Sequence, residues 1–248
     1  MRSEEFIATI SQMAEDTEKF EEVRKGIPLG MDVVGNVMLA QKRATPLTTR
    51  HTCVTGIKRV SFIRRLVITL SCLFEKDEAA FFIISPKTEY GELLRLQNID
   101  ATVPYVRSKE DLEAAKTTLK ELIQMRMHGK GYPRLFVVLD SLEELEGCNT
   151  NEDFEEYREL FDIVARKTDV DVITGLDMLK SIFKGYPGAF VGIGNCLVST
   201  REEGKADVTY VNDDASLSMP TVLNFPDSPS ITETIIFLNA LPPNKSEE

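Results

Sequence analysis

The central part of the chain alternates between short apolar runs and longer amphipathic stretches, which is the pattern of strands followed by helices. Strands are predicted at residues 52–55, 81–84, 102–106, 135–139 and 170–173. The run at 81–84, FFII, is apolar throughout, as expected for a strand that helices cover on both faces. The alternation predicts an α/β fold with a mostly parallel sheet flanked by helices.

The spacing of apolar residues predicts the helices between those strands. The helix after Gly56 has an apolar stripe on one side and, on the other, a polar face that we expect to be solvated: Ser61, Arg64, Arg65 and Ser71. The next helix is predicted to run to about His128, with Ser108 as its N-cap. Two further helices are predicted, one after residue 150 and one that follows Gly175 and runs through Lys184.

The two ends of the chain differ from this centre. Residues 1–40 form a predicted N-terminal arm: helical spacing at 3–25 is followed by IPLGMDVVGNVMLA, whose two apolar runs around Gly35-Asn36 predict a β-hairpin. Residues 41–242 are assigned to the main domain, in which short strand-like runs replace the alternation after residue 188. Residues 243–248 are a predicted frayed tail.

The charge of the chain disfavours free-standing binding to nucleic acid, because its formal net charge is −11. The distribution is uneven, however. No Asp or Glu occurs between Val33 and Phe74, and this basic window holds Lys42, Arg43, Arg50, Lys58, Arg59, Arg64 and Arg65. The window either attracts an anion near the segment 56–63 or presents a basic surface to solvent or to an acidic partner.

Composition also limits the compartment and the chemistry. No run of about 18 apolar residues is present, so no membrane span is predicted. The acidic N-terminus lacks the apolar core of a secretory signal. We therefore expect a cytoplasmic protein without direct membrane contact, or the soluble part of a membrane-anchored motor. Scattered cysteines, with Cys53 and Cys72 inside apolar runs, and only two histidines give no pattern for a zinc site or a catalytic triad.

The segment GIKRVSFI, Gly56–Ile63, lies where a P-loop would stand and has roughly that length. A working P-loop reads G-x-x-x-x-G-K-[ST]: backbone N–H groups cradle the phosphates, the Lys reaches the β- and γ-phosphates, and the hydroxyl holds Mg²⁺. Counted from Gly56, this chain places Ser61, Phe62 and Ile63 at the second glycine, lysine and hydroxyl positions. We expect the Phe62 ring to fill the phosphate site and exclude nucleotide.

A second candidate feature is Asp140, which follows the apolar run LFVVL. In RecA-like P-loop ATPases such an Asp holds Mg²⁺ through water, and a Glu directly after it polarises the attacking water. Here Ser141 follows, and we expect Glu143 and Glu144 to point elsewhere. Because Asp is also common where a strand turns, a capping role for Asp140 stays open.

The order of these pieces resembles the FtsK/SpoIIIE family of motor ATPases over about residues 27–198. The resemblance is carried by PLGMDVVGNVML, CVTG, FFIISPK with TEYGELLRL, RLFVVLDSLEEL and VDVITG. The strand-rich region after Gly185 is most similar to the C-terminal modules of the EssC/EccC motors of type VII secretion. The resemblance implies a RecA-like P-loop NTPase fold.

Three catalytic positions differ from the pattern of that family. Phe62 and Ile63 replace the P-loop Lys and Ser/Thr, and Ser141 replaces the catalytic Glu. Residues 173–175, ITG, replace the Ala-Thr-Gln sensor of the γ-phosphate, with Thr174 at its centre. The resemblance and its departures predict a module that is not an ATP-hydrolysing enzyme and that binds other ATPase-like modules or a secreted protein.

Two alternatives stay open. Lys58 or Arg59 could replace the missing lysine from within the loop, which would give a weak binder of ATP with Mg²⁺. The basic window could instead contact DNA in a translocase-like ring, although the net charge of −11 opposes this.

Overall fold

The fold is described from a computed structural model of the 248-residue chain. The structure describes residues 23, 26–40, 50–74, 77–96, 100–104, 106–128, 131–145, 159–160, 163–164, 170–176, 196–202, 204–211, 216–225 and 232. The helices predicted at 3–25, after residue 150 and between Gly175 and Lys184 lie largely or wholly outside these residues. The strand-like run TIIFL at 234–238, one of those predicted after residue 188, and the predicted tail also lie outside them. None of the helices in the described part has the length and apolar character needed to cross a bilayer.

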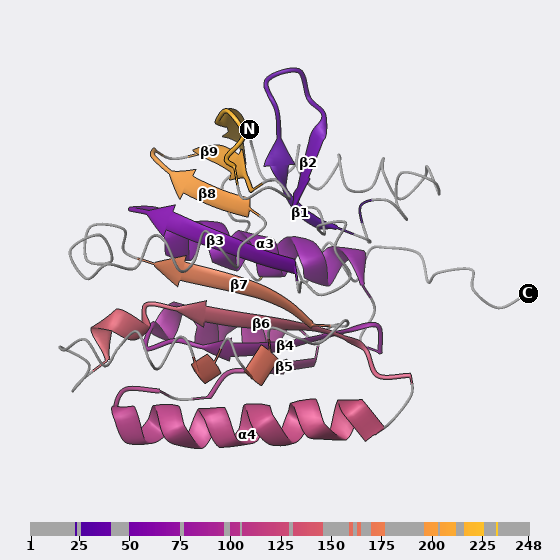
Figure 1. The fold of residues 1–248 in the computed structure, drawn as a ribbon, viewed down its shortest axis with the longest axis vertical. Coiled ribbons are helices and arrows are strands. Elements are labelled where there is room, and N and C mark those ends of the chain that lie inside the picture. The colour runs from indigo at the N-terminus through magenta and orange to yellow at the C-terminus, as the bar shows by residue number, and fades with distance from the viewer. Residues whose placement is uncertain are drawn as a thin grey trace, which may run out of the picture.

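The strands among the described residues form one sheet in the order β2-β1-β10-β9-β8-β3-β7-β6-β4-β5 (Figure 1). Their bounds are β1 Ile27–Met31, β2 Val37–Ala40, β3 Arg50–Gly56, β4 Ala79–Ile84, β5 Asp100–Thr102, β6 Arg134–Asp140, β7 Val170–Leu176, β8 Cys196–Thr200, β9 Lys205–Tyr210 and β10 Thr221–Asn224. The predicted strand at 102–106 is therefore wrong in its bounds, since β5 ends at Thr102.

Six strands, from β8 to β5 in the sheet order, pair in parallel, which confirms the predicted parallel arrangement. The carboxyl ends of parallel strands meet at one edge of a sheet. The pairing register shows which residues meet there: Gly56 lies opposite Thr200, and Asp140 lies opposite Gly175. The phosphate-loop candidate and Asp140 are thus brought to the same edge, with β7 between their strands.

The other strands extend the sheet in antiparallel pairs. The predicted hairpin is confirmed as β1 and β2, and the Asp32 carboxylate organises its turn by accepting the N–H groups of Val34 and Asn36, each at 2.9 Å. Met31 of β1 pairs with Asn224 of β10, so the hairpin belongs to the same sheet as the main domain. The proposed boundary at residue 40 stays a prediction.

Two long helices cover opposite faces of the sheet. Helix α3 (Arg59–Leu73) packs in one core with Phe81 and Ile83 of β4, whereas Phe82 and Ile84 lie in the core that contains the buried face of α4 (Lys109–His128). Because side chains alternate between the faces of a strand, these two sets mark the two sides of the sheet. Two short 3₁₀ helices, η1 (Thr88–Arg95) and η2 (Leu142–Glu144), follow β4 and β6.

A local sequence signal explains where helix α4 begins. Helix α4 starts after Ser108, as predicted: the Asp111 N–H donates to Ser108 Oγ (3.2 Å), and the Ser108 N–H donates back to the Asp111 carboxylate (3.0 Å).

The solvated face predicted for α3 is wrong for Arg65 and Ser71, both of which are buried. Arg65 is covered because β1 lies along α3, and its guanidinium donates to the carbonyl of Leu29.

Candidate functional site

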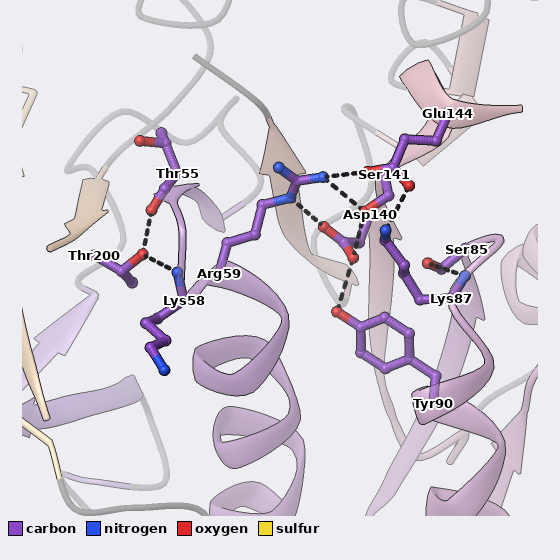
Figure 2. A network of polar contacts seen from close by, with 10 residues as sticks. All are labelled: Thr55, Lys58, Arg59, Ser85, Lys87, Tyr90, Asp140, Ser141, Glu144 and Thr200. Atoms are coloured by element: carbon purple, nitrogen blue, oxygen red, sulfur yellow. Dashed lines mark hydrogen bonds and ion pairs between the residues drawn. The ribbon is translucent and has the colours of Figure 1, made fainter. Parts of the chain in front are cut away.

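The turn after β3 is tight and is fixed to the end of β8 (Figure 2). Gly56 has a φ of +97°, and a Cβ there would lie 2.0 Å from the carbonyl oxygen of Thr200, so only glycine fits. Thr200 Oγ1 donates to the Thr55 carbonyl (2.7 Å) and accepts the Lys58 N–H (3.2 Å). A backbone donor of the turn is therefore already bound by a protein hydroxyl.

Helix α3 begins at Arg59, which makes the turn much shorter than predicted. The helix, as predicted, contains Ser61, Phe62 and Ile63, which the count from Gly56 had placed at the second glycine, lysine and hydroxyl positions of a P-loop. In G-x-x-x-x-G-K-[ST] five residues separate the first Gly from the Lys, whereas only Ile57 and Lys58 separate Gly56 from Arg59. In a P-loop the Lys and the Ser/Thr stand where the helix begins, and in this chain Arg59 and Val60 are the first two residues of α3.

The Phe62 side chain points into the core. It is fully buried, and its ring packs edge-on against Phe225, with centroids 4.9 Å apart and an interplanar angle of 87°. Arg65 lies over the same ring, 4.8 Å from the centroid. The aromatic ring thus contributes to the packing between α3 and the segment after β10, rather than to the turn before the helix.

Arg59 instead joins the turn to the end of β6 (Figure 2). Its Nε lies 3.1 Å from Asp140 Oδ1, and its Nη2 donates to Ser141 Oγ at 2.8 Å and to Glu144 Oε1 at 3.3 Å. Lys58 supplies its backbone to Thr200, and Figure 2 shows its side chain directed away from Asp140. Of the two basic residues predicted at the loop, the structure brings only Arg59 to Asp140.

Asp140 is fully buried and its carboxylate accepts several hydrogen bonds. Besides Arg59, the hydroxyl groups of Tyr90 (3.0 Å) and Ser141 (2.9 Å) donate to Oδ2. Burial raises the pKa of Asp140, while the Arg59 guanidinium and these hydrogen bonds act in the opposite direction. Burial, together with the neighbouring Asp140 carboxylate, also raises the pKa of Tyr90 well above its ordinary value.

Ser141 occupies the position of the expected catalytic Glu in an unusual backbone conformation. It has φ 60° and ψ 24°, the left-handed region that residues other than glycine rarely adopt. This conformation places its hydroxyl between Asp140 and Arg59. Gly175, which lies opposite Asp140 on β7, leaves space for the Asp140 carboxylate, because a Cβ at residue 175 would lie 1.8 Å from Asp140 Oδ1.

Glu144 is a site residue that the sequence reasoning missed. It was expected to point elsewhere, but its Oε1 accepts from Arg59, and its Oε2 is bound by Lys87. The short 3₁₀ helix η2 turns the chain back after Ser141 and so returns Glu144 to the start of α3. The sequence did offer a signal for Lys87, because it belongs to the FFIISPK stretch that carries the family resemblance. Its N–H donates to Ser85 Oγ at 3.1 Å.

Thr174, the proposed sensor, does not join this cluster. It lies inside β7, which continues to Leu176, and it shares a face with Val172 and the α4 core. Leu139 packs in the α4 core, and side chains alternate along the strand, so the next residue, Asp140, lies on the α3 side of the sheet. Thr174 Oγ1 is hydrogen-bonded to Nε2 of buried His51, and burial lowers the pKa of that histidine to about 3.

The parallel sheet, with a helix that starts directly after β3 and an Asp at the end of β6, is an α/β fold that several solved structures share. Neither a protein-family model nor a curated protein sequence matches this chain. Solved structures do match in fold. The cytoplasmic domain of the type VII secretion ATPase EccC of Thermomonospora curvata aligns with a TM-score of 0.58 at 10% identity, over 83% of this chain and 26% of that one.

Two further structures show the same fold. ATPases 2 and 3 of EssC from Geobacillus thermodenitrificans align with a TM-score of 0.52 at 15% identity, over 82% of this chain and 41% of theirs. The pCW3 conjugation coupling protein TcpA with ATPγS aligns with a TM-score of 0.57 at 11% identity, over 87% of this chain and 70% of that one. The chain thus spans well under half the length of the EccC and EssC proteins that it matches.

Proposed function

We propose that this chain is an ATPase-like module that does not hydrolyse ATP and that couples other proteins within a translocation motor, such as a type VII secretion motor. The observation that supports the proposal most strongly is the contact network of Arg59. The residue in the lysine position is bound by Asp140, Ser141 and Glu144, which leaves the candidate site closed by protein groups.

The residues present do not match the set that a P-loop uses for MgATP. The turn is shorter, Thr200 takes the Lys58 N–H, and Val60 has no hydroxyl for Mg²⁺. Asp140 already accepts from one cation and two hydroxyl groups, so its oxygens are engaged within the protein. A water-activating carboxylate directly after Asp140 is replaced by Ser141, which cannot act as a general base at neutral pH.

The role in a motor rests on fold similarity. The matched EccC and EssC structures are named as secretion ATPases, and one EccC structure holds ATPases 2 and 3 with a signal-sequence peptide. By analogy, the partners proposed for this chain are neighbouring ATPase-like modules or a secreted protein, in the cytoplasm. A module of this kind would contribute a rigid frame for contacts while other modules supply the chemistry.

The hydrolysis claim is tested by phosphate release from the full chain with MgATP. We expect the wild-type rate to equal that of the Arg59→Ala and Asp140→Asn variants, because no residue of this pair is used in catalysis. A wild-type rate well above that of both variants would refute the proposal. The partner claim is tested by mixing the chain with the candidate motor modules and measuring co-elution.

A second candidate function is weak nucleotide binding, and one observation favours it. Arg59 stands at the first position of α3, where its guanidinium could contact a phosphate if it released Asp140. Equilibrium dialysis with labelled ATP would then show binding that Arg59→Ala abolishes and Lys58→Ala does not. A DNA-contacting role stays a prediction that the net charge of −11 opposes.

A further inference from the structure

The geometry points to Glu144 as an internal anion that occupies a phosphate-binding cation pair, Arg59 and Lys87. Displacement of this carboxylate opens a site for a phosphate-class anion such as pyrophosphate or the phosphates of a nucleotide. The inference rests on the proposed function, because it explains why the closed network does not accept nucleotide in the free chain.

The two oxygens of the Glu144 carboxylate are bound by different elements of the fold. Oε1 lies 3.3 Å from Nη2 of Arg59, at the start of α3, and Oε2 contacts Nζ of Lys87, in the segment after β4 (Figure 2). These cations come from residues 28 positions apart, so the fold, not local sequence, brings them together. Two convergent donors around one anionic group form the arrangement that binds a phosphate.

The surroundings favour a negative group in that place. Helix α3 has 15 residues, no hydrogen bond from its N-cap side chain and no acidic residue in its first turn, so no residue of the helix itself offsets the partial positive charge of its N-terminus. Asp140 offsets only one of the two cations. With Glu144 in place, the pairs Arg59–Asp140 and Lys87–Glu144 sum to zero formal charge, so these four side chains give an incoming anion no net positive charge.

Glu144 is also the member of the network that can leave at the lowest cost. A third of its side chain is exposed, whereas Asp140 is fully buried. Rotation of the Glu144 side chain into solvent would free one donor on Arg59 and the ammonium group of Lys87 without moving β6. The carboxylate therefore acts as a plug, while Asp140 and Ser141 continue to hold Arg59 in position.

The test uses the full chain and the variant Glu144→Gln, titrated with pyrophosphate, inorganic phosphate and ATP without Mg²⁺. Removing one negative charge at contact distance from the anion should tighten pyrophosphate binding about tenfold or more relative to wild type. Glu144→Gln/Arg59→Ala should lose that gain. The matched control is Glu92→Gln, which breaks the exposed Arg64–Glu92 ion pair (2.6 Å) and should leave pyrophosphate binding unchanged.

The outcomes separate this inference from the proposed function. If Glu144→Gln and Glu144→Ala remain folded by circular dichroism and neither binds pyrophosphate or ATP more tightly than wild type, the plug is refuted, although the proposed function stands. If the wild-type chain hydrolyses MgATP, the proposed function fails first. A gain for ATP alone would assign the site to a nucleotide, and an equal gain for pyrophosphate would assign it to phosphate groups in general.

Discussion

Two arginines on helix α3 lie in very different surroundings. Arg59, in the first turn, contacts two carboxylates, Asp140 and Glu144. Arg65, two turns later, lies between the rings of Phe62 and Phe225 and donates to a backbone carbonyl. Burial lowers the pKa of Arg65 to about 9, so it still carries its charge at neutral pH.

The difference separates packing from charge within one helix. Around Arg65, aromatic rings and the aliphatic part of the side chain fill the space between α3, β1 and the end of β10. Around Arg59, the fold places charged groups at the carboxyl edge of the sheet, where ligands bind in parallel α/β folds. The middle of α3 is therefore expected to determine stability, and its first turn to determine what the candidate site accepts.

The largest effect is expected in the packed region. Phe62→Ala should lower the free energy of unfolding by about 3–5 kcal/mol, because it leaves a cavity beside Phe225. Urea unfolding measures the change, and Leu94→Ala, at a side chain that is 54% exposed, serves as the control and should cost about 0.5 kcal/mol or less. A loss below about 1 kcal/mol for Phe62→Ala would contradict the buried position of the ring.

At the first turn, the Arg59–Asp140 pair should behave as a coupled unit. A double-mutant cycle of Arg59→Ala and Asp140→Asn should give a coupling free energy of about 2 kcal/mol, since either single change leaves a buried group without its main partner. Thermal unfolding of the four proteins provides the values. Additive effects would show that the pair does not hold the two segments together.

The pH dependence of stability should distinguish His51, a buried histidine within the sheet, from Asp140 in the candidate site. The pKa of His51 falls from 6.5 unfolded to about 3 folded, so the unfolded chain binds a proton that the folded chain rejects. The contribution of His51 to the free energy of unfolding is fully present above pH 6.5. That free energy should fall by about 2 kcal/mol from pH 7 to pH 5. His51→Gln should remove this loss. Asp140, whose pKa burial raises, acts with the opposite sign, so Asp140→Asn should steepen the acid loss rather than reduce it.

The smallest effect is expected at Ser141. Ser141→Ala keeps the left-handed backbone at φ 60° and loses the hydrogen bonds to Asp140 and Arg59, which should cost about 1–2 kcal/mol. Ser141→Gly also loses the hydroxyl but relieves the backbone strain, so it should be about 1 kcal/mol more stable than the alanine variant. Equal stability of the two variants would show that this backbone carries no strain.

Patterns confined to one element were predictable from the sequence. The FFII and LFVVL runs, the Gly35-Asn36 turn and the Ser108 N-cap all depend on neighbours along the chain, and the structure contains each of them. The parallel arrangement followed from the alternation of strands and helices. The position of Asp140 at the same edge as Gly56 followed from that arrangement.

Features that depend on contacts across the fold were not predictable. Counting a motif from Gly56 assumed a full-length loop, whereas the helix starts at Arg59. The burial of Arg65 requires β1 to lie along α3, and the position of Glu144 requires η2 to turn back toward the start of that helix. Thr174 was proposed as a sensor from the family's Ala-Thr-Gln pattern after the late strand, but strand alternation directs it to the other face of the sheet.

The central claim is that Arg59 is held by Asp140 and Glu144 rather than by a nucleotide. Calorimetric titration of the wild-type chain with MgATP at pH 7 tests it most directly. The account predicts no saturable heat up to millimolar nucleotide. Saturable heat with a stoichiometry near one, lost in Arg59→Ala, would contradict it.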